Sequence, residues 1–404
     1  MVNYKNVAIR DVGTVVTGKT PPTANLEYYD GPYMFVTPTE LHGDYMITHS
    51  EKSLTEAGLE NIKNNSISGI SILVGCIGWD MGNVALCNSR CATNQQINSI
   101  TDIRDQYNPY YIYYWLSGKK DYLFSIASVT RTPILSKGDF EMVEIPLPPK
   151  PYQDMVADAL LSIDKKIALN NAINDNLQHQ LQTLYDYWFT QFDFPDENGR
   201  PYRSSGGQMV WCEELKREIP LDWEVKSLSQ LIKKNSQPFD YASEQPTIDL
   251  SVMPSNSIAL SDLNNSSNFT TNLYIMKRGD ILFGSIRPYL HKAGIAPCDG
   301  MFAGTVHSYS VLEADNYNFV LFSICRDAFF DYAVNVSAGT KMPVVSSDSI
   351  LAFKVPYSAK LAHSFNQISV MDIITKNVQE NQRLIKLRDW LLPMLMNGQA
   401  TISD

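Results

Sequence analysis

The first segment with a chemical signature is residues 13–20, GTVVTGKT, which fits the phosphate-binding loop pattern G-x-x-x-x-G-K-[ST]. Phosphate binding by this pattern requires a helix that begins at the Gly-Lys pair, so that backbone N–H groups face the phosphates. Here Pro21 and Pro22 follow at once, and a residue before proline is disfavoured in the α-helical region. We therefore interpret the match as coincidental.

A second segment, residues 108–111 (NPYY), partly resembles the Asn-Pro-Pro-aromatic motif that holds a flipped base in amino-methyltransferases. The second proline is missing, and no glycine-rich strand-turn-helix precedes the segment. We expect instead that Asn108 caps a helix and that Pro109 occupies its first turn. Cys87 and Cys91 have no second Cys/His pair near them, and the six histidines lack metal-ligand spacing. The sequence therefore predicts no catalytic residue, no metal site and no cofactor in this chain.

Composition limits the functions that this chain can have. Of the 404 residues, 44% are apolar, and the net charge is −10. Such a charge argues against indiscriminate binding to nucleic acid, which depends on neutralising phosphates. Any DNA binding must use local basic loops or a partner that supplies cationic surface. Scattered cysteines, short apolar runs and no signal-peptide pattern in residues 1–30 favour a cytoplasmic protein without a membrane span.

Two long helices are predicted to position the remaining parts of the chain. In residues 154–191, mostly apolar residues recur at alternating steps of four and three: Val156, Leu160, Ile163, Ile167, Asn170, Asn174, Leu177, Leu181, Leu184 and Trp188. The same positions 207 residues later are His363, Gln367, Val370, Ile374, Asn377, Asn381, Leu384, Arg388, Leu391 and Leu395. This spacing indicates a helix that buries one stripe against another helix.

Shorter matches extend the repeat over the whole chain. Residues 72–77 match 281–286, residues 130–136 match 340–346, residues 145–146 match 355–356, and residues 9–12 align with 225–228. We expect the first pair to be buried strands that end in glycine-permitted turns. Each repeat is thus a mixed α/β globule followed by a long helix. Turn-forming residues dominate 192–222, which predicts a surface connection.

Several motifs then point to a known family. They are TGKTP at residues 17–21, FVTP at 35–38, NQQI at 94–97, IPLPP at 145–149, FDFPDENGRPY at 192–202 and IPLDW at 219–223. With these motifs the full length of the chain resembles the specificity subunit of type I DNA restriction-modification systems. The second repeat departs from the first because it has no clear counterpart of residues 17–21.

The resemblance implies an α+β protein. Two mixed α/β target-recognition domains would be separated by two long helices that form an antiparallel coiled coil, giving a pseudo-two-fold internal repeat. The expected boundaries are 1–150 for the first domain, 151–191 for the first helix, 192–222 for the linker, 223–357 for the second domain and 358–400 for the second helix. A helix of about 36 residues is roughly 54 Å long. Half-sites one DNA turn apart are about 34 to 36 Å distant, so this helix could span an unread gap.

The resemblance also implies a function and partners. Each domain would read one half of a bipartite site in duplex DNA, and the coiled coil would dock two modification subunits, with restriction subunits joining the complex. The chain itself would be non-catalytic, and S-adenosylmethionine, ATP and magnesium would belong to the partner subunits. Two alternatives stay open: a coiled-coil scaffold carrying two protein-binding domains, and a stand-alone methyltransferase or nuclease, for which no motif is found.

Candidate DNA-contacting residues lie in the repeated turns. Arg131 and Lys341 occupy equivalent places in a Thr-basic-x-Pro turn, where a cation can meet a phosphate or a groove. The remaining candidates are Lys19, Thr20, Thr37, Trp79, Asn83 and Thr132 in the first domain, and Arg287, Tyr289, His291 and Lys292 in the second. Arginine is suited to guanine and asparagine to adenine, whereas Trp79 could equally belong to the core.

The two asparagines at the centre of each stripe are candidates for fixing the register of the coil. We expect Asn170 and Asn174 to meet Asn377 and Asn381, because a shifted register would bury unpaired amides. The alternative is that they are simply tolerated polar residues in long helices.

Overall fold

The computed structural model describes residues 3–129, 131–239, 243–368 and 370–399. Its contacts divide the chain into two compact units, residues 1–168 with 384–404 and residues 169–383. Each unit includes part of both long helices, because Val156 and Leu395 pack into the core of the first unit, whereas Leu181 and Ile374 pack into the core of the second. The boundaries expected from the sequence between globules and helices stay a prediction. Thr130, in the first matched turn, lies outside the described residues.

The first unit is built on two sheets. One has the order β2(Thr14–Thr17), β10(Ile97–Thr101), β7(Ile70–Gly75), β8(Val84–Asn88) and β4(Met46–Ile47), and the other β5(Lys52–Leu54), β3(Tyr29–Val36), β9(Cys91–Thr93) and β6(Ser66–Ile67). The first unit also contains two strand pairs. They are β1(Lys5–Ala8) with β13(Glu144–Leu147), and β11(Ser128–Val129) with β12(Pro133–Ile134). Its helices are α1(Ile9–Val12), α2(Glu56–Asn61), α3(Pro109–Ser117), α4(Lys120–Ser125) and α5(Lys137–Glu141), with short turns η1(Leu26–Tyr28), η2(Pro38–His42) and η3(Lys63–Asn65).

The second unit also has two larger sheets. Their orders are β17(Ile232–Lys234), β24(Val306–Val311), β21(Ile281–Gly284) and β22(Ala293–Ile295), and β19(Asn264–Asn265), β18(Pro246–Ile248), β23(Gly300–Ala303) and β20(Leu273–Met276). Two further pairs are β16(Glu224–Ser227) with β25(Lys354–Tyr357) and β14(Met209–Cys212) with β15(Arg217–Pro220). The helices are α7(Tyr317–Ile324), α8(Asp327–Asn335), α9(Ser347–Leu351) and α10(Ala359–Asn366), and the short turns are η5(Leu228–Gln230), η6(Ser266–Asn268), η7(Pro288–Leu290) and η8(Ala314–Asn316).

The two units share one strand order. The run β2-β10-β7-β8 corresponds to β17-β24-β21-β22, and the other main sheet of each unit contains one parallel pair, β3 with β9 and β18 with β23. The expected buried strands are present as β7 and β21, in which Ile72 and Ile281 are fully buried. Apolar runs that lie in the middle of a sheet are covered on both faces, which explains why they were readable from the sequence.

The aligned starts of the two repeats need a correction of three residues. The sequence paired Ile9 with Val225, but the Ile9 backbone N–H donates to Val143 O and the Leu228 N–H donates to Phe353 O. Ile9 therefore corresponds to Leu228. The apolar residue three positions later is also buried in each case, Val12 after Ile9 and Leu231 after Leu228, so the matching feature is one helical turn rather than a strand.

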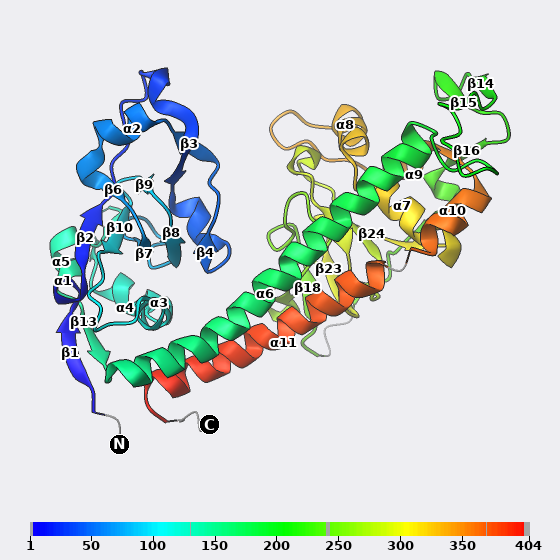
Figure 1. The fold of residues 1–404 in the computed structure, drawn as a ribbon. Helices are drawn as coiled ribbons and strands as arrows, with labels where there is room; N and C mark the ends of the chain where they lie inside the picture. Colours follow the sequence, from blue (N-terminus) through cyan, green and yellow to red (C-terminus); the bar gives the residue numbers. More distant parts are fainter. Residues whose placement is uncertain (1–2, 130, 240–242, 369, 400–404) are drawn as a thin grey trace. The chain divides into compact units, whose positions relative to one another are not determined.

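The two long helices are α6(Lys150–Tyr185), which continues as a π-helix, η4(Asp186–Thr190), and α11(Val370–Met396). They lie side by side and run antiparallel (Figure 1). In the second unit Asn170 bonds to Asn381 and Asn174 to Asn377, whereas in the first Asp164 bonds to Arg388. In the first unit the Tyr152 hydroxyl also donates to Leu395 O, so in each unit higher residue numbers in α6 meet lower numbers in α11.

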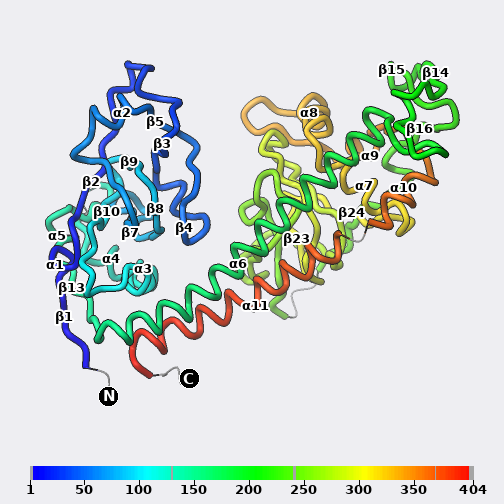
Figure 2. The backbone as a smooth tube through the Cα atoms, viewed as in Figure 1, coloured from blue at the N-terminus to red at the C-terminus, as the bar shows by residue number. Residues whose placement is uncertain are grey.

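The second long helix does not cover residues 358–400 as one piece. It is divided into α10 and α11, which Figure 2 shows as separate coils. His363 and Gln367 are exposed and polar where the first copy has Val156 and Leu160, so the buried stripe begins only at Val370. The Asn318 side-chain amide stabilises the end of α10 by donating to the backbone oxygens of Phe365 and Ile368, at 3.2 and 3.3 Å.

The segment 192–222 is more than a surface connection. Its turn residues are exposed as predicted, but Phe192 is fully buried and Phe194 and Ile219 belong to the same core. The Phe194 ring stacks on Tyr202 and on Trp223, with centroids 4.6 and 5.4 Å apart. Because aromatic side chains bury a large apolar area, these phenylalanines attach the segment to the second unit, and the β14–β15 hairpin extends from it.

Among the described residues, no helix combines the length and the apolar character that crossing a bilayer would require.

Candidate nucleic-acid interface

In each unit, the loop that follows a central strand is bonded to the turn that precedes a short helix. In the first unit the Gly78 N–H donates to Pro133 O and the Leu135 N–H donates to Cys76 O, both at 2.9 Å. In the second unit, Arg287 N–H donates to Pro343 O at 2.7 Å and Val345 N–H donates to Ser285 O at 2.9 Å. We call residues 76–83 with 131–136 the first paired-loop edge, and residues 285–292 with 339–346 the second.

The backbone of these edges turns at a position that the sequence did not identify. A glycine-permitted turn was expected at Gly75 and Gly284, but neither residue has a positive φ. Positive φ values fall instead on Gly78 and Gly82 in the first edge, at 108° and 94°, and on Arg287, His291 and Gly339 in the second, at 53°, 51° and 96°. A left-handed conformation costs a non-glycine residue about 1–2 kcal/mol. Arg287 is therefore held in this conformation by its surroundings, a situation that is frequent at functional sites.

The short helices after both edges begin in the same way. Ser136 caps α5 by accepting from the Asp139 N–H, and Ser346 caps α9 by accepting from the Ser349 N–H. A serine cap fixes where the helix starts, so the preceding turn, with Arg131 in one unit and Lys341 in the other, is anchored at both ends. Both cations are exposed.

In the first paired-loop edge, the Trp79 side chain is exposed, whereas the Asn83 side chain is hydrogen-bonded within the protein. Trp79 is 70% exposed and rests only loosely against Phe124, with ring centroids 6.2 Å apart. The alternative that it belongs to the core is therefore wrong. The Asn83 amide donates to Asp80 O at 3.0 Å, and its oxygen accepts from Lys120 Nζ at 2.9 Å. Reading adenine with this side chain would require breaking those bonds.

Asp80 is the centre of the network that holds Asn83. Lys120 Nζ lies 2.6 Å from one carboxylate oxygen of Asp80, and His42 Nε2 lies 3.0 Å from the other. The hydrogen bond from Lys120 lowers the pKa of the Asp80 carboxyl. Sequence reasoning missed both His42 and Lys120, because they lie about 40 positions away on η2 and α4. The candidate side chains that this edge leaves available are Trp79, Arg131 and Thr132, all exposed.

Lys19 and Thr20 adjoin this edge through residues 94–97. The Thr20 hydroxyl donates to Gln95 Oε1 at 2.9 Å, and Gln96 O accepts from the Cys76 N–H at 2.7 Å. Lys19 is exposed, and no helix begins at it, as the two prolines predicted. Gln95 was not a candidate, although its exposed amide lies in the polar NQQI segment. That segment could have indicated an exposed amide beside Thr20.

Thr37 has a structural role instead. Its hydroxyl and its backbone N–H both donate to Glu40 Oε2, each at 2.8 Å, and this capping box starts η2. A hydroxyl engaged in a cap is a poor candidate for direct DNA contact.

In the second paired-loop edge, two of the five candidates are committed to the fold. The His291 ring stacks on Phe330 with centroids 4.4 Å apart, and its Nδ1 lies 3.2 Å from Asp327 Oδ1. Lys292 Nζ donates to Leu250 O at 2.9 Å. Arg287, Tyr289 and Lys341 are exposed, together with Met342, an apolar side chain that sequence reasoning missed.

The chemistry available at both edges is recognition rather than catalysis. A guanidinium can donate two parallel hydrogen bonds to guanine, and an ammonium can neutralise a phosphate. The described residues contain no group of three or more His, Cys, Asp or Glu side chains that could hold a metal ion. Cys87 and Cys91 approach to 3.4 Å but are both buried. Asn108 caps α3 as expected, by accepting from the N–H groups of Tyr110 and Tyr111.

A second polar site lies between the long helices within the second unit. Asn170 Nδ2 donates to Asn381 Oδ1 at 2.8 Å, and Asn377 Nδ2 donates to Asn174 Oδ1 at 2.9 Å. Two residues outside the predicted set complete the cluster: Asn171 accepts from Asn381 at 2.8 Å, and Glu380 accepts from Asn170 at 2.7 Å. Asn170 Oδ1 is buried without a partner. The amides therefore bond across the two helices in one specific alignment.

Within the first unit an ion pair joins the same two helices to α3. Arg388 donates to Asp164 Oδ1 at 2.9 Å, and the Tyr114 hydroxyl donates to Asp164 Oδ2 at 2.6 Å. Asp164 is only 3% exposed, so its charge depends on these partners. Arg388 was expected at a stripe position, but its acidic partner was not identified from the sequence.

Comparison with known proteins adds three findings. Residues 1–179 match the family model described as type I restriction modification DNA specificity domain. The chain is 26% identical to the type I restriction enzyme MjaIX specificity subunit of Methanocaldococcus jannaschii, covering 98% of this chain and 93% of that protein. It is 31% identical to the HindI specificity subunit of Haemophilus influenzae over 42% of this chain and 37% of that protein.

A solved structure has a similar fold. The crystal structure of a type I restriction-modification S subunit from M. genitalium aligns with a TM-score of 0.58 and 15% identity, covering 100% of this chain and 97% of that one.

Proposed function

The chain belongs to the specificity subunits of type I restriction-modification systems, a non-catalytic family, and from this premise we propose that its two units read the two halves of a split target in duplex DNA. The observation that carries the proposal is the pair of equivalent edges. Each unit joins the same two loops by the same backbone hydrogen bonds, yet the exposed side chains differ. Equivalent scaffolds with different side chains suit two different half-sites.

The local charge supports DNA contact at these edges despite the acidic chain. Arg131 in the first unit and Arg287 and Lys341 in the second are exposed cations on loops that the backbone holds in place. Phosphate contacts position a protein on the duplex, and base contacts specify sequence. We assign Arg287 to base reading and Lys341 and Arg131 to phosphate or groove contact. Trp79, Tyr289, Lys19 and Thr20 would border the contacted surface.

The long helices would dock two modification subunits, and restriction subunits would join the same cytoplasmic complex. This part of the proposal is supported by large apolar side chains that the helices expose. In the second unit they are Leu169 and Ile173 on α6 and Ile373 on α11, and in the first unit they are Leu387 and Trp390 on α11. Exposed apolar patches on otherwise polar helices are typical of interaction sites. S-adenosylmethionine, ATP and magnesium would be bound by the partners. The antiparallel repeat would give the subunit pseudo-two-fold symmetry.

Loop exchange in a reconstituted complex tests the proposal. The chain would be combined with its cognate modification subunit, and the methylated motif would be determined by methylation-sensitive sequencing. Replacing residues 285–292 and 339–346 with the loops of a relative that has another target should change one half of the motif. The other half and the gap should stay as they were. A motif without two halves, or a change in both halves, would contradict the assignment.

A further inference from the structure

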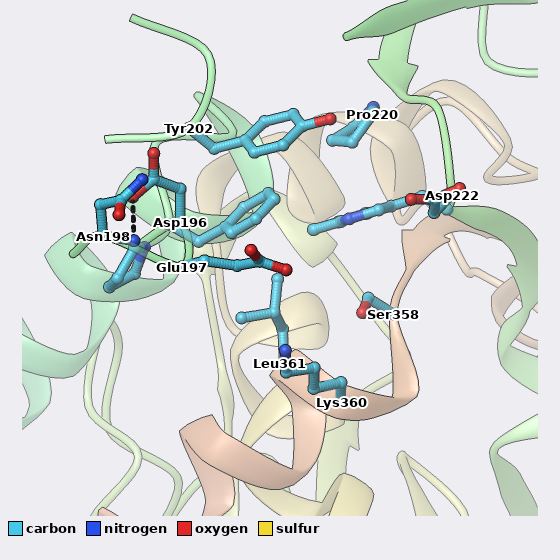
Figure 3. A pocket seen from close by; sticks show the side chains of 12 residues that line it. Asp196, Glu197, Asn198, Tyr202, Pro220, Asp222, Ser358, Lys360 and Leu361 are labelled. Carbon is cyan, nitrogen blue, oxygen red and sulfur yellow. Dashed lines mark hydrogen bonds between the residues drawn. The ribbon is translucent and has the colours of Figure 1, made fainter. Parts of the chain in front are cut away.

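An open cavity of about 450 Å³ lies in the second unit, where the segment after α6 meets the start of α10 (Figure 3). The functions assigned above do not use it. Its walls combine aromatic rings with acidic side chains, and the residues that the argument uses are Phe194, Glu197, Tyr202, Asp222, Trp223 and Lys360. A concave site with an apolar wall and a few charged groups is the usual form of a binding pocket.

The aromatic wall of the cavity is held in place by the core. Phe194 stacks between Tyr202 and Trp223, with interplanar angles of 17° and 25°. Trp223 also meets Phe192, whose ring is fully buried, at a centroid distance of 5.2 Å. Because these contacts reach into the core, the wall is formed before any ligand arrives. Phe194 has a neighbouring ring on each face, so a cation would rest against Tyr202 or Trp223, the outer rings of the stack, because the face of an aromatic ring attracts cations.

A tight turn places one carboxylate over this wall. Asp196 accepts from the N–H groups of Asn198 and Arg200, at 2.8 and 2.9 Å, and forms an ion pair with Arg200. Gly199 completes the turn with a φ of 73°. Figure 3 shows the Glu197 carboxylate directed toward the middle of the cavity, with Asp222 on the opposite side of the view. Asp196 is therefore committed to the turn, whereas Glu197 faces the cavity.

The charges that line the cavity indicate which kind of ligand it can bind. Within the parts of the chain that are described, neither the Glu197 nor the Asp222 side chain has a hydrogen bond or an ion pair. Lys360 is the single basic residue of the lining. The two carboxylates without a partner, Glu197 and Asp222, outnumber the one lysine of the lining. The cavity therefore repels phosphate groups and does not suit DNA. A cation that lies on an aromatic face between two carboxylates would satisfy both features.

We propose that this cavity binds an arginine or lysine side chain of the modification subunit. The cationic group would lie between the carboxylates of Glu197 and Asp222 and against the Tyr202–Phe194–Trp223 wall. The inference rests on the proposed function, from which the partner is taken. It adds a specific anchoring site, at the end of α6 and the start of α10, to the apolar docking surface of the long helices. The two carboxylates of the cavity would complement a basic side chain of that partner.

The test is the affinity of the full-length chain for the purified cognate modification subunit. The double variant Glu197→Gln/Asp222→Asn keeps the size of both side chains and removes both charges. We expect affinity about tenfold weaker, with a shallower dependence on salt. A single Glu197→Lys change, which places a cation in the cavity, should weaken binding at least as much. Both carboxylates are exposed and unpaired, so thermal unfolding should match that of the unaltered chain.

The control is Glu213→Gln/Glu214→Gln, which makes the same change of charge in the β14–β15 turn, outside the cavity. These carboxylates pair at the surface with Lys216 and Lys354, and such pairs contribute little. Binding unchanged by the cavity variants, or weakened equally by the control, would overturn the inference while leaving the proposed function intact. Failure of the unaltered chain to bind the modification subunit would instead contradict the proposed function.

Discussion

At the scale of single residues, Arg287 and Lys341 lie on the same paired-loop edge, but we expect them to contact DNA in different ways. Arg287 is fixed by its left-handed backbone and its bond to Pro343 O, whereas Lys341 projects from an exposed turn. We expect Arg287→Ala to relax the preference at one base pair, a loss of about 1–3 kcal/mol of discrimination. Lys341→Ala should weaken all sequences alike and reduce the salt slope by about one. A filter-binding salt series on half-site variants, with the reconstituted complex, measures both. Lys277→Ala, which removes a cation paired with Asp299, is the control. Uniform weakening by Arg287→Ala would rule out base reading.

At the scale of elements, we expect the asparagine cluster to decide how α6 and α11 align. Asn381→Leu alone removes one of the two acceptors of Asn170, which keeps Glu380, and the donor to Asn171. This loss should cost about 1–3 kcal/mol. Replacing Asn170, Asn174, Asn377 and Asn381 together with leucine removes the unpaired amides, so the helices should stay associated but sample more than one alignment. Spin labels on the exposed positions 173 and 376 report this as a broadened distance distribution, against one narrow peak for the labelled parent. A single narrow peak in the fourfold variant would show that apolar packing alone fixes the register. The four asparagines would then be tolerated polar residues.

At the scale of the whole molecule, the net charge of −10 opposes binding to a polyanion. The cations that we assign to DNA contact, Arg131, Arg287 and Lys341, lie on small loops, so few counterions should be released when the isolated chain meets DNA. We expect weak binding by this chain alone at about 0.15 M salt, and much tighter, sequence-dependent binding once the modification subunit is added. Titration of a labelled target duplex, with and without the partner, gives the comparison. A scrambled duplex controls for sequence-independent affinity. Tight, specific binding by the isolated chain would show that the partner supplies no necessary cationic surface.

Much of the scaffold was readable from the sequence because its signals are local. The first four residues of each run, 72–75 and 281–284, lie in strands β7 and β21, Asn108 caps a helix, and the 4-3 stripe forms α6 and most of α11. A strand or helix in the core must place apolar residues with its own period, so neighbouring residues are sufficient to reveal it. The break before Val370 was missed because the stripe was extended through His363 and Gln367. The burial of Phe192 was missed because turn formers surround it.

Only the tertiary structure decided which candidate side chains are free to meet DNA. Asn83, His291 and Lys292 have the residue types of DNA readers, yet Lys120, Phe330 and the Leu250 carbonyl engage them. Those partners lie about 37 to 42 positions away along the chain, so no local pattern announces them. The sequence determined where the loops and helices would be. The tertiary structure determined whether each polar group forms its hydrogen bonds within the protein or remains available to a ligand.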